Sequence, residues 1–290
     1  DVCSSDLPFL NLINAYIGKT PITEIKSVAC MNNGEIYANQ ERDYIAALDD
    51  LPFPDYSLLN LKNYWKNHHN MNGVVADKKY THIISSRACP YHCIYCHDVF
   101  GKTVRRRSPE NFFSEIKMLH DRYGITEFHI VDDIFNLDRD RLHAILNLII
   151  DSGLNIKMAF PNGVRGDILE KGDIDLLQQA GAYMLTFAIE SGSPRIQQVI
   201  RKNLNIAKVL ENIDYAAKKG MITKGFFMLG FPGETRAELR ETVSVAVRSR
   251  LDLAHFFTVT PFAGTELATL ANRLYPGLDT DSSVYYWQGK

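Results

Sequence analysis

Cysteine is scarce in this chain, and long apolar runs are missing. The 290 residues include five cysteines, which is too few for the dense disulfide framework of a small secreted domain and suggests a reducing compartment. No apolar stretch approaches the ~18 residues that a membrane-spanning helix needs. We therefore expect a cytoplasmic protein without a membrane span.

The chain also lacks an excess of charge of either sign. Its 32 basic and 34 acidic side chains leave a formal charge of −2, so the global electrostatic footprint of a nucleic-acid-binding protein is absent. The one basic cluster joins Lys102 to 105–107. Such a run usually forms a solvated loop, which is our interpretation, and the alternative is contact with an anionic ligand.

Short apolar runs alternate with amphipathic segments from residue 80 onward. The expected strands span 80–84, 126–131, 156–160, 184–189, 223–229 and 255–259. Continuous apolar runs are typical of parallel strands that are covered on both faces. With right-handed crossovers, six β–α units form either a doubly wound sheet or a partial barrel, and the pattern leaves both open.

Capping signals mark the helices between these strands. One helix begins at Ser108 and Pro109 and ends at Gly124, and a second spans 138–153. A third begins with a capping box at 235–238. The buried stripes are predicted to contain Phe112, Ile116 and Leu119 in the first, Leu142, Ile145, Leu146 and Ile149 in the second, and Leu239, Val243 and Val247 in the third.

A cysteine-rich loop directly follows the first of these strands. Cys89, Cys93 and Cys96 stand at a C-x3-C-x2-C spacing. Three thiolates hold three corners of a cubane [4Fe–4S] cluster and leave one iron open to a further ligand. The alternative is a Cys3His zinc knuckle completed by His92 or His97, which is disfavoured because structural zinc sites usually pair two such knuckles.

This spacing, with Tyr95 before the last cysteine, resembles the signature of the radical S-adenosylmethionine (SAM) superfamily. The resemblance covers 76–270 and implies a partial (β/α)6 TIM-like barrel within the α/β class, with its chemistry at the carboxyl ends of the strands. It implies a [4Fe–4S] cluster that reductively cleaves SAM to a 5′-deoxyadenosyl radical. An electron donor such as flavodoxin or ferredoxin is implied as well.

The same resemblance assigns cofactor-binding residues at successive strand ends. Asp132 or Asp133 is expected to meet the SAM amino group, Glu190 the ribose hydroxyls and Lys202 the SAM carboxylate, with Arg201 as a substitute for Lys202. Arg165 is a further candidate, either for a carboxylate or for a neighbouring helix, after the polar loop 161–165. The remaining cofactor-binding candidates are Tyr95, Ser191, Met228 and Gly230.

The first eighty residues do not form a complete domain pattern. A helix-like piece at 9–16, a hairpin around 32–34 and a proline-punctuated stretch at 48–56 resemble the tail and connector of a cobalamin-binding domain. We therefore assign 8–75 to that tail and linker, and expect cobalamin in the full-length protein. Residues 1–7 resemble a translated sequencing adapter and are expected to be non-biological, and 271–290 are expected to begin a C-terminal extension.

The leading hypothesis is a cobalamin-dependent radical SAM C-methyltransferase acting on a small molecule or natural product. The alternatives are an anaerobic oxidative cyclase, a methylthiotransferase and, outside enzymes, a zinc-stabilised binding module. No catalytic side chain is assigned beyond the cofactor ligands, because the cofactors supply the chemistry. His129 and Tyr91 are candidate substrate contacts, although packing or solvation is the commoner role of such residues.

Overall fold

The computed structural model describes residues 6–18, 20–32, 34–39, 41–67, 74–97 and 99–276. The first five residues of the expected leader, including Cys3, and most of the expected C-terminal extension lie outside these ranges. The boundary expected at residue 270 falls inside the last described helix. None of the described helices is both long and apolar enough to cross a membrane.

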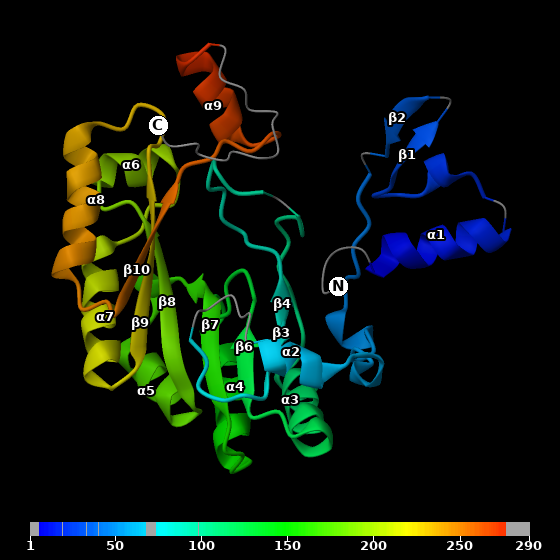
Figure 1. Cartoon of the computed structure of the whole chain (residues 1–290), viewed down its shortest axis with the longest axis horizontal. Helices are drawn as coiled ribbons and strands as arrows, with labels where there is room; N and C mark the ends of the chain where they lie inside the picture. Colours follow the sequence, from blue (N-terminus) through cyan, green and yellow to red (C-terminus); the bar gives the residue numbers. More distant parts are fainter. Residues whose placement is uncertain are drawn as a thin grey trace.

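Six parallel strands form the central sheet, in the order β10-β9-β8-β7-β6-β3. Their bounds are β3 Tyr80–Ile83, β6 Glu127–Ile130, β7 Lys157–Val164, β8 Ala182–Glu190, β9 Ile222–Leu229 and β10 Leu253–Thr258. Each of these strands follows a helix in the chain, and helices cover the outer face of the curved sheet (Figure 1). This confirms the predicted α/β fold and its six strands as a partial TIM-like barrel.

The three helices that the sequence predicts are present as α3, α4 and α8. The bounds of the barrel helices are α3 Pro109–Tyr123, α4 Arg139–Asp151, α5 Lys171–Gln179, α6 Pro194–Val199, α7 Ile206–Lys218, α8 Arg236–Arg248 and α9 Glu266–Leu274. In α3 the Ser108 side chain accepts from the backbone N–H of Asn111, and Gly124 ends the helix at φ 66°. The predicted inward residues of α3 and α4 are all buried.

The buried face predicted for α8 is wrong. Val243 and Val247 are 40% and 77% exposed, whereas Thr242 and Ala246 are buried. The helix lies so close to the loop after β8 that a Cβ on Gly192 would approach the backbone of Thr242 to 3.0 Å. At that distance α8 turns Thr242 and Ala246 inward, and Val243 and Val247 lie on the outer side of the helix.

The polar loop predicted at 161–165 is wrong as well, because strand β7 continues through Pro161 to Val164. The pairing of β7 with β8 shifts register between Phe160 and Val164. Proline has no N–H to donate to a ladder, and an irregularity of this kind accommodates it. The irregular end of β7 carries Gly163 and Val164 to the carboxyl edge of the sheet.

The N-terminal part lies to one side of the sheet (Figure 1). It contains α1 Asp6–Gly18 and an antiparallel hairpin of β1 Ala29–Asn32 and β2 Glu35–Ala38, as the sequence predicts. The short helical turn η1 Ile22–Glu24 belongs to it as well. The turns η2 Leu48–Asp50 and η3 Tyr56–Leu58 and helix α2 Leu61–Asn67 lead to the barrel, where Tyr56, Leu61 and Trp65 pack against the core. Cys30 in β1 is half-buried.

Buried arginines attach this N-terminal part to the barrel. Strand β4 Ser86–Arg87 pairs with β5 Arg105–Arg106, and Arg105 and Arg107 are each 9% exposed. Arg105 donates to the backbone oxygen of Ile45 at 3.0 Å, and its guanidinium lies 4.6 Å from the ring centre of Tyr44. The interpretation of this basic run as a solvated loop is therefore wrong, since Arg105 joins the linker to the loop after the cysteines.

Candidate functional site

A cavity of about 590 Å³ opens at the carboxyl ends of the barrel strands. The predicted site residues that line it are Cys89, Cys93, Tyr95, Cys96, Asp133, Arg165, Glu190 and Lys202. They come from the cysteine loop and from the ends of β6, β7 and β8 and the loop after α6. The fold thus brings together residues that are separated by more than 100 positions in the sequence, in the place where barrel enzymes hold their chemistry.

Two backbone features shape the cysteine loop. Ala88, just before Cys89, has φ 80°, a conformation that non-glycine residues rarely adopt and that occurs often at functional sites. Ile94 is buried, donates its N–H to the oxygen of Ile200 at 3.1 Å and accepts from the N–H of Leu267 at 2.9 Å. The loop is therefore fixed at its centre, and its three thiols face the cavity around that anchor.

The three thiols fit a shared cluster. They are free, and partial burial together with repulsion among the thiols raises the pKa of Cys89 and Cys96. Within the described residues, no three His, Cys, Asp or Glu side chains converge on a point where one metal ion would sit. A donor set of three thiols suits an iron–sulfur cluster, in which each thiolate binds a different iron.

Three polar side chains, those of Tyr95, Glu190 and Lys202, line the same cavity as the thiols. Lys202 Nζ lies 2.8 Å from Glu190 Oε1 and 3.3 Å from the hydroxyl of Tyr95. Burial, and then the negative charge of Glu190, raises the pKa of Tyr95 well above its ordinary value. Glu190 itself has φ 67°, and Arg201, the neighbour of Lys202, has φ 54°. Two strained positions thus hold the carboxylate and ammonium groups in the cavity.

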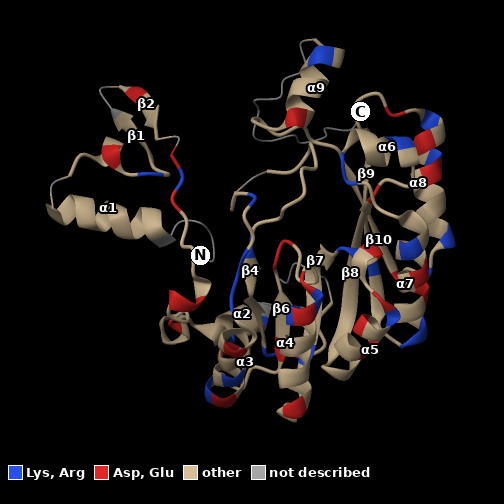
Figure 2. Ribbon diagram, turned by 180° about the vertical axis from the view of Figure 1, so that it is seen from behind, with Lys and Arg blue, Asp and Glu red and all other residues tan. Residues whose placement is uncertain are grey.

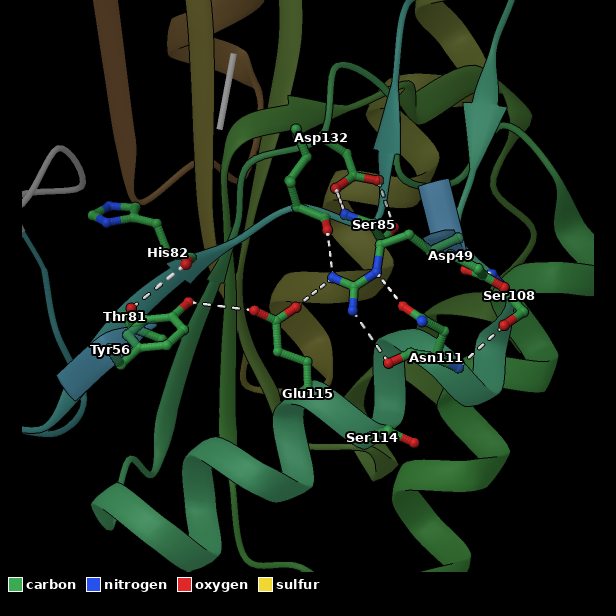
Figure 3. A network of polar contacts seen from close by, with 12 residues as sticks. Asp49, Tyr56, Thr81, His82, Ser85, Ser108, Asn111, Ser114, Glu115 and Asp132 are labelled. Carbon is green, nitrogen blue, oxygen red and sulfur yellow. Dashed lines mark hydrogen bonds and ion pairs between the residues drawn. The ribbon is translucent and has the colours of Figure 1, made fainter. Parts of the chain in front are cut away.

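Asp132 and Asp133 have different surroundings. Asp132 is 2% exposed and accepts from the N–H of Ser85 at 2.7 Å and from the hydroxyls of Ser85 and Ser86 at 2.6 Å each (Figure 3). Burial raises the pKa of Asp132, and these hydrogen bonds oppose the rise. Asp133 instead lines the cavity beside Cys89. Of the two carboxylates, that of Asp133 is accessible to a ligand.

A network of polar contacts connects Tyr56 and Glu115 to the segment that holds Asp132 (Figure 3). Arg107 pairs with the buried carboxylate of Glu115 and donates to the backbone oxygen of Ile84 at 3.1 Å. The hydroxyl of Tyr56 donates to Glu115 at 3.4 Å. The backbone just before Ser85, whose groups hold Asp132, is therefore fixed to α3 and to the linker.

Two other predicted residues are already engaged within the protein. Arg165 lies 3.0 Å from Asp167, and its guanidinium stacks 3.8 Å from the ring centre of Tyr91. Ser191 is fully buried and lies 3.2 Å from the hydroxyl of Thr242 in α8. Arg165 thus reaches the cavity as part of an ion pair, and Ser191 is not among the residues that line it.

Met228 and Gly230 lie at the end of β9. Met228 packs against an apolar cluster that includes Ile94 and Phe231. Gly230 has φ 94°, donates its N–H to the carboxylate of Glu234 at 2.7 Å, and has open space where a Cβ would lie. This backbone is exposed and lets a flat group approach closely, which a side chain would hinder.

Four further residues line the cavity that were not predicted to belong to the site. They are the polar residues Lys224 and His255 and the aromatic residues Phe226 and Phe257, on β9 and β10. The sequence feature that could have identified them is the lysine inside the apolar run 223–229, because a charged residue is rarely buried in a strand unless it has a partner or a function. His129, a candidate substrate contact, is instead fully buried 2.7 Å from Glu127 and does not line the cavity.

His82 in β3 makes the stability of the barrel sensitive to acid. Burial, and then the nearby His129, lowers its pKa from 6.5 to about 4. The unfolded chain therefore binds a proton between these pH values while the folded chain does not. We expect the free energy of unfolding to fall by about 1.5 kcal/mol from pH 6.5 to pH 5 because of this residue.

Chemical denaturation of wild-type and His82→Gln protein across that range measures the contribution. The wild-type curve is expected to fall more steeply than that of the variant. His120→Gln, in the last turn of α3 and 29% exposed, serves as the control for replacing a histidine by glutamine. Equal slopes for wild type and His82→Gln would contradict the assignment.

Comparison with known proteins decides the family. The profile of the radical SAM superfamily matches residues 83–246, more than half of the chain and including all three cysteines. The chain belongs to the radical SAM superfamily. Enzymes of this superfamily use a [4Fe–4S] cluster and SAM, and membership removes the support for a zinc-stabilised binding module.

The relatives within the radical SAM superfamily include methyltransferases. The chain is 31% identical over 273 residues to an uncharacterized methyltransferase, PH0819, of Pyrococcus horikoshii, covering 93% of this chain and 57% of that protein. It is 32% identical over 255 residues to cytidylyl-2-hydroxyethylphosphonate methyltransferase of Streptomyces wedmorensis, covering 83% and 47%. The chain thus spans about half the length of these curated relatives.

A solved radical SAM structure shares the fold. The methyltransferase TsrM of Kitasatospora setae, bound to tryptophan and a SAM analogue, superposes with a TM-score of 0.69 at 15% identity, covering 88% of this chain and 50% of TsrM. A further structure of TsrM contains cobalamin and a [4Fe–4S] cluster. At this identity the likeness concerns the fold.

Proposed function

We propose that this chain is the catalytic barrel of a cobalamin-dependent radical SAM C-methyltransferase. The observation that supports the proposal most is that one cavity is lined by Cys89, Cys93 and Cys96, by Asp133 and by the ion pair of Glu190 and Lys202. The three thiolates suit the cluster, and the accessible carboxylate and the carboxylate–ammonium pair suit the polar groups of SAM, which is an amino acid joined to a nucleoside. A flavodoxin or ferredoxin in the cytoplasm is the expected electron donor.

The residues have distinct roles in this proposal. The three cysteines hold the cluster, which when bound supplies the electron for reductive cleavage of SAM. Asp133 accepts from the SAM ammonium, and Lys202 donates to the SAM carboxylate. Glu190 accepts from the ribose hydroxyls, as an acidic residue does in dinucleotide sites. Lys202 carries three donors and therefore has capacity for both Glu190 and a ligand.

The carboxylate–ammonium pair also prepares the site for a zwitterionic ligand. Both side chains are about nine-tenths buried, so Lys202 and Glu190 neutralise each other while no ligand is present. A ligand with its own carboxylate and hydroxyls replaces part of that pairing without leaving a buried charge uncompensated. Gly230 offers open backbone for the adenine at the neighbouring strand end.

A second cavity supports the cobalamin part of the proposal. It measures about 670 Å³ and lies between the N-terminal part, including Val28, Asn39 and Tyr44, and the cysteine loop at Cys93 and Cys96. A cobalamin domain that precedes this segment has access to the cysteine loop from that side. The methyltransferase names of the two relatives and of TsrM favour methyl transfer over cyclisation or methylthiolation.

Anaerobic reconstitution with iron and sulfide tests the radical SAM part. We expect a brown protein with about four irons that converts SAM to 5′-deoxyadenosine after reduction with dithionite. A colourless protein that retains zinc and leaves SAM intact would overturn the proposal. In a longer protein with its cobalamin domain, formation of S-adenosylhomocysteine indicates methyl transfer, and its absence favours the cyclase.

A further inference from the structure

One buried cation in the cavity has no carboxylate partner. Lys224 on β9 is 1% exposed, although the lysines and arginines of the barrel lie mainly on the outer helices (Figure 2). Its ammonium lies 4.9 Å from the ring centre of Phe226. Within the described ranges, Lys224 has no ion pair or hydrogen bond from its side chain. It faces the cavity with an unmet positive charge.

The other cations that line the cavity by β7 and β8 differ in this respect. Lys202 pairs with Glu190 at 2.8 Å, and Arg165 pairs with Asp167 at 3.0 Å. An ammonium that is buried without a carboxylate partner loses its hydration, and the contact of Lys224 with the ring of Phe226 offsets only part of that loss. Burial accordingly lowers the pKa of Lys224. The fold keeps a destabilising group at this position, which points to a role toward a ligand.

A neighbour of Lys224 adds hydrogen-bonding capacity. His255 on β10 lines the same cavity, and burial, and then the positive charge of Lys224, lowers the pKa of His255. Phe226 and Phe257 form the apolar wall beside these groups.

We propose that Lys224, with His255, forms a subsite that binds an oxyanion of the substrate. A carboxylate or phosphonate accepts several hydrogen bonds and is stabilised most by a charged donor in a water-poor cavity. The subsite lies on β9 and β10, whereas the three cysteines come from the loop after β3. This inference rests on the proposed function and restricts the substrate class to anionic molecules.

Binding of small oxyanions to the reconstituted protein tests this subsite. Methylphosphonate and acetate are titrated in the presence of excess SAM, so that Lys202 is occupied, and binding is followed by ³¹P and ¹³C NMR line broadening. We expect saturable binding of at least one probe, and at least about tenfold weaker binding to Lys224→Met. The probe that binds more tightly distinguishes a phosphonate from a carboxylate.

Two further measurements separate this role from a structural one. Lys224→Met should melt at or above the wild-type temperature, because it removes a buried charge that has no carboxylate partner. Lys117→Met on the surface of α3 should bind the probes like wild type. Equal binding by Lys224→Met and wild type, or no binding by wild type, would overturn the subsite. Failure of wild type to cleave SAM would instead count against the proposed function.

Discussion

Cys93→Ala is expected to lose both the bound iron and the formation of 5′-deoxyadenosine, whereas Cys30→Ala should retain both. Cys93 is one of the three thiols that line the cavity, and the described cysteines offer no replacement, since Cys30 lies in the N-terminal hairpin. With two thiolates the cluster loses one of its three protein corners. We expect iron content and product to fall to the background of unreconstituted protein.

The measurement is iron and sulfide content of anaerobically reconstituted variants, with 5′-deoxyadenosine determined by chromatography. Circular dichroism and thermal unfolding serve as the folding control, because Cys93 is only half-buried and its removal should leave the barrel intact. Four irons in folded Cys93→Ala would show that this loop does not hold the cluster. Loss of iron in Cys30→Ala would instead indicate that the hairpin contributes a ligand.

The regular parts of the fold were predictable because local patterns agree with their tertiary setting. The cap of α3 at Ser108 and the apolar runs of the strands depend on near neighbours in the sequence. Val243 and Val247 in α8 did not follow the apolar stripe, because the close approach to Gly192 decides which face fits. That distance depends on residues fifty positions apart and leaves no local signal.

In the candidate site, too, the features that depend on local sequence were predictable and those that depend on tertiary packing were not. The spacing of the cysteines is local, and the resemblance predicted Glu190 and Lys202, which the fold pairs within 2.8 Å. The engagement of Ser191 with Thr242 could not be predicted, because it depends on how α8 docks onto the loop after β8. Lys224 is recognisable in the sequence as a charged residue within an apolar run, but only the structure shows that it lines the cavity.

The strongest contrast between neighbouring residues is expected at Asp132 and Asp133. Asp132→Ala leaves the N–H of Ser85 and the hydroxyls of Ser85 and Ser86 without their acceptor in a buried position. We expect the free energy of unfolding to fall by about 3–5 kcal/mol, since buried donors lose their full compensation when an acceptor is removed. Asp133→Ala should change it by less than about 1 kcal/mol, because this side chain is accessible from the cavity.

The affinity for SAM should be lowered more by Asp133→Ala than by Asp132→Ala, which is the reverse of the order expected for stability. Asp133→Ala removes a charge-assisted acceptor for the SAM ammonium, so we expect binding to weaken by about 10- to 100-fold while the cluster remains. Equilibrium dialysis of reconstituted protein measures the affinity, and urea denaturation measures the stability. If Asp132→Ala were stable and deficient in SAM binding while Asp133→Ala bound SAM normally, the roles of the two carboxylates would be exchanged. The two measurements together therefore decide which aspartate meets the cofactor and which one holds the cysteine loop in place.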